Sequence, residues 1–219
     1  MAESFVSIEP KLEDYWRGIV LFGRNVASYK FSLAKSLLRL QPKSGELVKL
    51  EELAPIYSKH ITEHLKKANK QGSSNSSKFL DGCRKYNSGE IDRNELTDLT
   101  LRYGFKNVID AFHIVGNGEI PQRFYIDERR SNKGIRITEE FENLLNRQQS
   151  INLPKEVEAR WSLVETAWEL GVSRSLVSIE HDEDEQLLYT FDSERRRKSI
   201  TGSREALNGY QKGKCFYCF

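Results

Sequence analysis

Two cysteines near the end of the sequence, Cys215 and Cys218, have the spacing of metal ligands. Two thiolates in a Cys-x-x-Cys arrangement reach one Zn²⁺, and Gly213 allows the tight turn that such a knuckle needs. Lys212 and Lys214 favour the thiolate form by their charge. A thioredoxin-like redox motif has the same spacing, but it opens a helix after a strand near the start of its fold. The pattern therefore favours half of a structural zinc site.

Positive charge is concentrated in the same part of the chain. The formal net charge is +2, whereas residues 193–219 carry seven Lys or Arg against two acids, so they sum to +5 and the rest of the chain to −3. Such an imbalance is typical of a surface that meets a polyanion, although a solvated basic tail is the plainer alternative. We expect DNA binding by Arg195, Arg196, Arg197, Lys198, Arg204, Lys212 and Lys214.

A second candidate for metal chemistry is HITEH, where His60, Glu63 and His64 match the H-x-x-E-H pattern of some zinc proteases. The match is short, and both histidines fall beside an apolar helical stripe. We therefore favour structural histidines over ligands. The glycines of GNGE, at residues 116–119, indicate a turn and lack the lysine of a phosphate loop. The acids after His181 indicate a charged hairpin tip.

The segment LNGYQKGKCFYCF resembles the opening knuckle of HNH endonucleases of the ββα-metal class. In that family a first Cys-x-x-Cys is followed by a strand with catalytic histidine, a conserved Asn and a second Cys-x-x-Cys. Cys215 and Cys218 match the first pair of zinc ligands. The helical segments YWRGIVLFGRNVASYKFSLAKSLL and EVEARWSLVETAWELG are similar to the N-terminal regions of bacterial nucleases of this kind.

The resemblance implies the DNA-binding N-terminal region of a restriction or defence endonuclease, with its catalytic core expected after Phe219. It implies a structural Zn²⁺ bound through a half site, and Mg²⁺ in the complete enzyme. No catalytic residue is expected within the chain, so we expect the chain alone to be inactive. The alternative is a stand-alone, non-catalytic helical module that binds protein or nucleic acid. Trp16, Trp161 and Trp168 would supply a partner surface for it, although tryptophans at helical spacing more often belong to the core.

The composition fits a soluble protein with one sizeable core or two small ones. It is 38% hydrophobic and 30% charged, and no run approaches the ~18 apolar residues of a spanning helix. The acidic N-terminus does not resemble a signal peptide, and three cysteines are too few for a disulfide framework. We expect a cytoplasmic protein with no membrane partner, and a homodimer is left open. Cys83 is expected to be a buried apolar residue.

Apolar periodicity indicates that the first half of the chain is helical. One long helix is expected over residues 15–40, ended by Pro42 and weakened by Gly18 and Gly23, and a second over residues 50–69. Its Pro55 is tolerable only in a first turn. Shorter helices are expected at residues 78–86, 94–103, capped by Asp92, and from 138. The clearest helix follows Pro154 and stops at Gly171, with a stripe formed by Val157, Trp161, Val164 and Trp168.

Strand-like runs occur at residues 123–128 and 133–138, and again at 175–180 and 186–191, with a third C-terminal strand in RRRKSI. The fold class expected is mainly α with a small β component (α+β). A boundary near residues 171–175 separates a helical body, residues 1–172, from a basic segment, residues 173–219, that contains a β-hairpin and leads into the zinc knuckle. A change of layer within one domain is the alternative.

Overall fold

The computed structural model describes residues 10–23, 26–73, 76–116 and 118–171, together with the backbone of residues 180–182, 187–191 and 197–199. It confirms a mainly α fold with a small β component. The helices are α1 (Leu12–Arg17), α2 (Tyr29–Leu40), α3 (Leu50–Leu65), α4 (Lys78–Ser88), α5 (Arg93–Leu99), α6 (Val108–Ala111), α7 (Arg129–Asn132), α8 (Glu139–Leu145) and α9 (Leu153–Leu170). Two π-helical turns, η1 (Gly18–Phe22) and η2 (Thr100–Gly104), and a 3-10 turn, η3 (Gln148–Asn152), extend them.

Three small antiparallel sheets accompany the helices. The first has the order β1 (Leu47–Lys49), β5 (Gly134–Ile137), β4 (Tyr125–Glu128), and the second pairs β2 (Ile114–Val115) with β3 (Gly118–Glu119). The third has the order β6 (Glu180–Asp182), β7 (Leu187–Phe191), β8 (Arg197–Ser199). No helix of the described part is long and apolar enough to cross a membrane.

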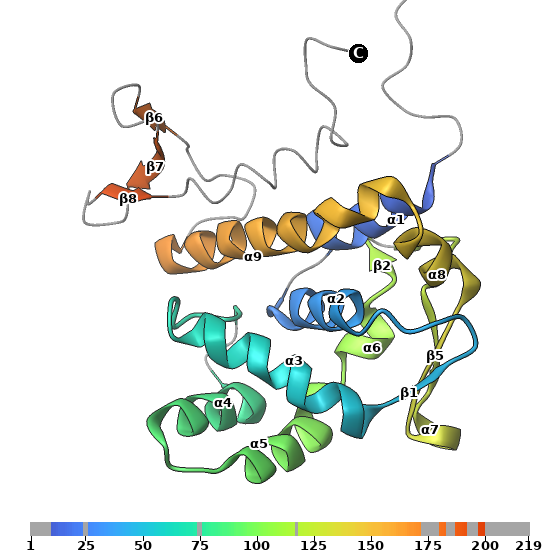
Figure 1. The fold of residues 1–219 in the computed structure, drawn as a ribbon. Coiled ribbons are helices and arrows are strands. Elements are labelled where there is room, and N and C mark those ends of the chain that lie inside the picture. Colours follow the sequence, from blue (N-terminus) through green and yellow to red (C-terminus); the bar gives the residue numbers. More distant parts are fainter. Residues whose placement is uncertain are drawn as a thin grey trace, which may run out of the picture.

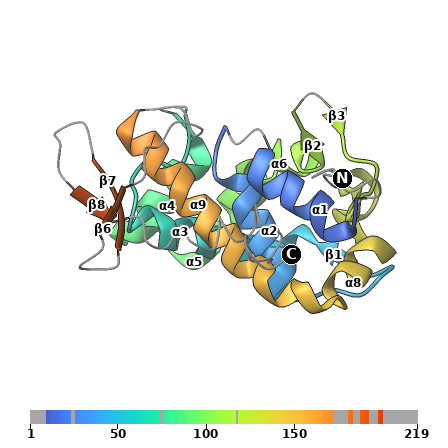
Figure 2. The same cartoon turned by 90° about the horizontal axis from the view of Figure 1, so that it is seen from above.

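The helices are stacked around α2. In Figure 1, α9 lies along one side of α2 and α3 along the other, with α4 and α5 beyond α3. Seen from above, α8 lies at the end where α9 begins (Figure 2). Because α2 is contacted on both sides, most of its residues are buried, including Phe31, Leu33 and Leu37.

Helix α9 confirms the clearest prediction from the sequence. It has Pro154 at its second position and ends at Gly171, whose φ of 66° is a left-handed value that glycine adopts without strain. The predicted stripe of Val157, Trp161, Val164 and Trp168 is buried. A buried ion pair between Arg17 and Glu156, with N···O distances of 2.9 and 3.0 Å, ties α9 to α1.

The long helix expected over residues 15–40 is wrong, because two helices with a break between them occupy this range. Gly23 lies where the chain turns away from η1 and bridges Val115. A Cβ at Gly23 would stand 2.2 Å from the carbonyl oxygen of Ile19, so only glycine fits. Phe22 and Val26, both placed on the expected apolar stripe, are 61% and 51% exposed. The apolar periodicity of residues 15–40 is therefore divided between two separate helical segments, α1 with η1 and α2.

The second helix begins at Leu50, as expected, but it is shorter than expected and does not have its proline in the first turn. Because α3 begins at Leu50, Pro55 lies in its second turn rather than its first. The helix ends at Leu65 instead of residue 69. The chain after it turns back along residues 26–28, where Ser28 N donates to Gln71 O at 3.0 Å and Ser73 N donates to Val26 O at 2.9 Å. The apolar pattern continues beyond Leu65, but the chain there pairs with residues 26–28 and leaves the helix.

The shorter predicted elements are largely confirmed. Asp92 caps α5 by accepting bonds from the backbone N–H groups of Asn94 and Glu95 at 2.7 and 2.9 Å. Strands β4 and β5 form the expected antiparallel pair, with Tyr125 opposite Ile137. The sequence did not indicate β1, which has only three residues. Strand β1 pairs with β5 because Gly134 of β5 has no side chain and lets the backbone of Val48 come close. A Cβ at Gly134 would lie 2.5 Å from the carbonyl oxygen of Val48.

In the C-terminal sheet, two of the three expected strands agree with the structure, and residues 175–179 of the first lie outside the described residues. Strand β7 covers the run expected at residues 186–191, and β8 lies within RRRKSI. Strand β6 begins at Glu180, so His181 and Asp182 lie in a strand, although the sequence placed them in the turn. The segment that holds the predicted boundary, beyond Gly171, lies outside the described residues.

The three tryptophans belong to the core. Trp16, Trp161 and Trp168 are 1%, 0% and 9% exposed, so the hypothesis that they form a partner surface is wrong. Trp16 packs against Phe112, Phe124 and Phe141, with ring centroids 5.2 to 5.8 Å apart. Burial of these large rings supplies much of the apolar surface that stabilises the body.

Candidate functional site

Most residues of the site predicted from the sequence lie outside the described residues. These are the metal ligands and five of the basic residues: Cys215, Cys218, Arg195, Arg196, Arg204, Lys212 and Lys214. Only the backbone of Arg197 and Lys198 is described, in β8, where they pair with Phe191 and Thr190 of β7. The zinc half site and the basic DNA-binding segment therefore stay predictions.

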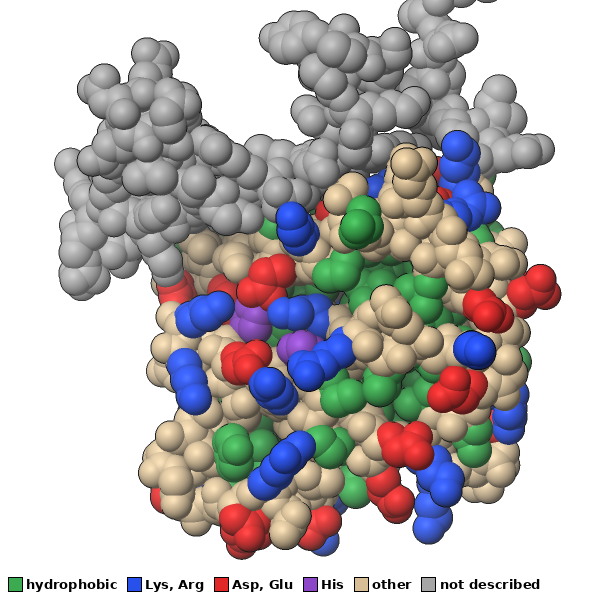
Figure 3. Space-filling view, viewed as in Figure 1, with side chains coloured by type: hydrophobic (Ala, Val, Ile, Leu, Met, Phe, Trp, Pro, Cys, Tyr) green, Lys and Arg blue, Asp and Glu red, His purple; other side chains and the backbone are tan. Residues whose placement is uncertain are grey.

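The structure places both histidines of HITEH on α3, where both are buried. Figure 3 shows histidine side chains on this face with basic and acidic side chains around them. His64 stacks on Trp161 with the ring centroids 3.5 Å apart and the planes 1° from parallel. Its Nδ1 lies 2.7 Å from Oε1 of Glu165, and its Nε2 lies 3.2 Å from Oε2 of Glu158. Both ring nitrogens are thus occupied by contacts to α9, which confirms a structural role for His64.

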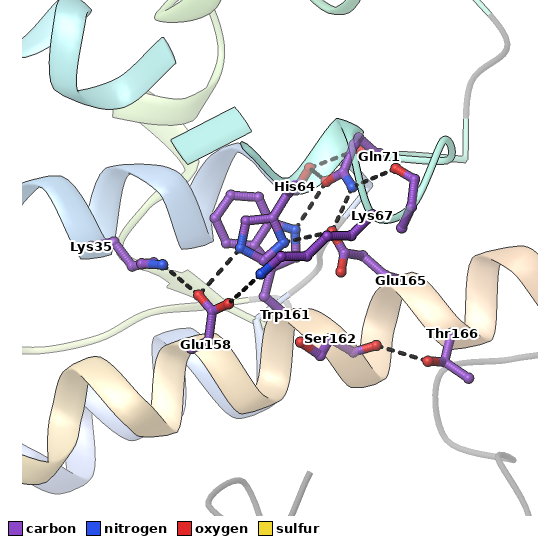
Figure 4. A network of polar contacts seen from close by, with 11 residues as sticks. Lys35, His64, Lys67, Gln71, Glu158, Trp161, Ser162, Glu165 and Thr166 are labelled. Carbon is purple, nitrogen blue, oxygen red and sulfur yellow. Dashed lines mark hydrogen bonds and ion pairs between the residues drawn. The ribbon is translucent and has the colours of Figure 1, made fainter. Parts of the chain in front are cut away.

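His64 belongs to a polar network that joins α2, α3 and α9 (Figure 4). Glu158 also binds Lys35 of α2, and Glu165 accepts a bond from Gln71. Gln71 in turn accepts bonds from Trp161 Nε1 at 2.9 Å and from Ser28 Oγ at 2.6 Å. Since nearly every polar atom of the network has a partner, burial costs it little. The network fixes α9 and the chain after α3 against α2.

Charge within this network shifts two pKa values in opposite directions. Burial lowers the pKa of His64, but its hydrogen bonds to Glu158 and Glu165 outweigh burial and leave that pKa raised. Burial raises the pKa of Glu158, but the bonds from His64 and Lys35 outweigh it and hold the pKa at about 2. Each shift favours the charged form of its group, which is imidazolium for His64 and carboxylate for Glu158.

His60 is the unsatisfied member of the pair. It is 6% exposed, and neither ring nitrogen has a hydrogen-bond partner in the described part of the chain. Burial, followed by the charges of Lys35 and Arg39, lowers its pKa to about 4, so it is neutral at physiological pH. No group of three or more His, Cys, Asp or Glu side chains among the described residues is placed to hold a metal ion.

The other buried histidine and cysteine also have structural surroundings. Burial lowers the pKa of His113 to about 3, and its Nε2 accepts a bond from Phe124 N at 3.0 Å. Within GNGE, Gly116 lies in a turn after β2, whereas Gly118 and Glu119 form β3, and residue 117 lies outside the described residues. Cys83 is fully buried, which raises the pKa of its thiol well above the usual range and confirms its interpretation as an apolar core residue.

The described body has a cavity of about 500 Å³. It lies between the start of α2, the start of α4 and the segment from η2 to α6, beside the bridge between Ala27 and Gly72. The wall is largely apolar. Its polar groups include Tyr29 and Tyr103 and the three lysines Lys30, Lys78 and Lys106, and no Asp or Glu is among the described residues that line it.

The polar wall of this cavity is ordered by contacts between its own residues. The hydroxyl of Tyr29 lies 2.6 Å from Oγ of Ser77, which caps α4 by accepting a bond from the backbone of Leu80. Lys78 Nζ lies over the ring of Tyr103, 5.4 Å from its centroid. Lys30 is 6% exposed and donates from Nζ to Ile114 O at 2.8 Å. The cavity therefore has a fixed, positively charged lining.

Comparison with known proteins adds no family. The chain matches no family model, no curated protein and no solved structure. Function must therefore be inferred from the residues and their geometry.

The lining of the cavity is the part of the candidate site that the sequence did not indicate. Tyr29, Lys78 and Tyr103 come from three separate segments, and no spacing within the sequence connects them. Only the Ser77 cap left a local signal, as a serine directly before the first residue of α4. The cavity exists because the chain after α3 returns to residues 26–28 and brings the start of α4 beside α2.

Proposed function

We propose that this chain is the DNA-binding body of an HNH-type endonuclease of the ββα-metal class, in which Cys215 and Cys218 are two ligands of a structural zinc. The observation that carries the proposal is the segment LNGYQKGKCFYCF, which combines the Cys-x-x-Cys knuckle with flanking aromatic and basic residues. Two thiolates supply half of the tetrahedral shell that structural zinc takes, and the family pattern supplies the other half from a second Cys-x-x-Cys.

The charge distribution supports the DNA-binding part of this proposal. The basic segment sums to +5 against −3 for the rest of the chain, so a polyanion is attracted to one part of the molecule. Contacts from Arg and Lys to phosphates position a duplex without reading its sequence. The resemblance assigns hydrolysis, and the Mg²⁺ that assists it, to the part of the family pattern that follows the first Cys-x-x-Cys. The role proposed for this chain is binding.

A stand-alone helical binding module is the second candidate. The lysine-lined cavity in the described body favours it, because a cavity of this kind binds a ligand without any catalytic group. The same body would serve either role.

The experiment measures binding of the full chain to two fluorescent duplexes of unrelated sequence over a range of salt concentrations. One variant replaces Arg195, Arg196, Arg197 and Lys198 with glutamine. A control variant removes the same charge from exposed lysines of the body: Lys43, Lys66, Lys85 and Lys155.

We expect the basic-segment variant to bind both duplexes more weakly and with a flatter salt dependence. Each lost phosphate contact lowers the slope of log K against log salt concentration by about 0.9. The control variant should keep most of the slope. An unchanged slope in the basic-segment variant, or an equal loss in the control, would mean that this segment is only a solvated face.

A further inference from the structure

We propose that the cavity between α2, α4 and α6 binds a nucleoside monophosphate unit, with the base against its tyrosines and the phosphate at its lysines. The cavity lies wholly in the described body and is separate in sequence from the basic segment. The inference goes beyond the proposed function and does not depend on it, because it requires neither the zinc knuckle nor the contacts to a duplex.

The size and surface of the cavity fit a small amphipathic ligand. Its volume of about 500 Å³ falls within the range of about 300 to 1,000 Å³ that small-molecule sites occupy. Phe79, Leu80 and Val108 contribute apolar wall, whereas the polar groups gather at the start of α4. A ligand with one flat apolar part and one charged part would contact both surfaces.

The charge of the lining selects an anion. Lys30, Lys78 and Lys106 line the cavity, and no acidic side chain among the described lining residues offsets them. Lys78 and Lys106 are exposed, so a ligand reaches them without displacing the core. Lys78 is also the first residue of α4, an eleven-residue helix whose N-terminal dipole adds to the attraction for a phosphate. Burial lowers the pKa of Lys30 to about 8, and an anion nearby would offset that effect.

The aromatic residues favour a planar base over an acyl chain. Tyr29 and Tyr103 are half-buried, so each leaves part of its ring at the cavity. Tyr29 is held by Ser77 and by an edge contact to Phe79, with ring centroids 5.5 Å apart. Nucleobases stack on such rings whatever their sequence, because every base has a π-face. We therefore expect the cavity to bind a nucleotide without selecting among the bases.

A nucleotide could reach the cavity free in solution or as part of a single strand. The experiment therefore titrates the full chain by calorimetry with deoxynucleoside monophosphates, with inorganic phosphate and with a short single-stranded oligonucleotide. The test variants are Lys78→Gln and Tyr103→Leu. The matched controls are Lys85→Gln and Tyr86→Leu, which lie on α4 but outside the cavity. Thermal unfolding without ligand identifies any variant that fails to fold; Lys78 is chosen because it is exposed.

We expect at least one mononucleotide to bind, each test variant to weaken it at least tenfold and the controls to bind as the original chain does. Inorganic phosphate should bind at least tenfold more weakly than the nucleotide. If the oligonucleotide competes with the mononucleotide, the natural ligand is a nucleotide within a single strand. If it does not compete, the natural ligand is a free nucleotide. The proposal is overturned if neither nucleotides nor the oligonucleotide bind, if phosphate binds equally well, or if the test variants behave like the controls.

The outcome is separable from that of the proposed function. The variant in which Arg195, Arg196, Arg197 and Lys198 are replaced leaves the cavity intact, so it should retain nucleotide binding even where duplex binding is lost. A loss of nucleotide binding in that variant would contradict the proposal that the cavity is the site.

Discussion

At the scale of single residues, His64 gives the clearest example of a side chain whose role depends on its neighbours. Its stacking on Trp161 and its bonds to Glu158 and Glu165 span from 94 to 101 positions in the sequence. The i, i+4 spacing to His60 indicated a shared helix face, and both histidines do lie on α3. The two rings nevertheless differ, because carboxylates surround only one of them.

The ion pair of His64 with Glu158 should make stability depend on pH. The pKa of His64 is raised above 6.5, so its stabilisation is complete below that value and is lost as the pH rises through the folded pKa. The pKa of Glu158 is lowered to about 2, so its stabilisation is present above 4.5 and is lost as the pH falls towards 2. We expect His64→Gln to lower the free energy of unfolding by about 2 kcal/mol near pH 6, the size of a lost hydrogen bond to a charged group, because Glu158 is partly exposed and solvent screens its charge.

Urea unfolding at several pH values measures this effect. The difference between His64→Gln and the original chain should narrow as the pH rises through the folded pKa of His64, because the original chain then loses the imidazolium charge too. Glu63→Gln is the matched control, because Glu63 is exposed on the same helix and contacts only Lys59 among the interactions of the described residues. A constant difference across the pH range would show that stacking on Trp161, rather than charge, is what the substitution removes.

At the scale of elements, the break between η1 and α2 shows how one glycine divides an apolar pattern between two helices. Gly18 and Gly23 both weakened the expected helix, but the structure distinguishes them. A Cβ at Gly18 would meet nothing within 4 Å, whereas at Gly23 it would collide with the backbone of Ile19. Gly18 is tolerated in a helix, and Gly23 is required where the chain turns.

Alanine at the two positions should therefore have opposite effects. We expect Gly23→Ala to destabilise the protein by about 2 kcal/mol, since the backbone must move to relieve the collision. Gly18→Ala should be neutral or stabilise by up to about 1 kcal/mol, because alanine favours helix. Urea unfolding of the two variants compares them directly. Equal effects would mean that the chain at Gly23 adapts without cost.

At the scale of the whole molecule, the described body is held together by an aromatic core and a buried ion pair. Its three tryptophans and the aromatic rings around them are buried, and α1 is held to α9 by a buried ion pair. The predicted zinc ligands, Cys215 and Cys218, lie outside the described residues. The fold of the body and the binding of zinc should therefore be independent.

We expect a chelator to leave the thermal midpoint of the full chain unchanged within about 1 °C, and to remove zinc that two thiolates hold only weakly. Zinc content after dialysis and the unfolding curve are measured together, with Cys215→Ser as the comparison. Loss of 1 kcal/mol shifts the midpoint by about 2–4 °C in a protein of this size. Tightly held zinc that is lost together with the fold would reveal a complete site with further ligands.

Local chemistry in the sequence determined the elements whose ends are set by their own residues. Asp92 caps α5, while Pro154 and Gly171 mark the two ends of α9. The apolar stripe of α9 also identified its buried face. These signals work because capping, fixed φ values and helical periodicity act within a few residues and need no distant partner.

Only the tertiary structure decided the features that depend on distant segments. Strand β1 exists because Gly134 admits the backbone of Val48, and α3 stops at Leu65 because the following chain pairs with residues 26–28. The same return of the chain after α3 to residues 26–28 also forms the lysine-lined cavity and brings Gln71 into the network around His64. The spacing of residues along the sequence does not report such contacts. Steric fit and charge pairing act between segments that are far apart in the sequence, whereas periodicity describes each segment alone.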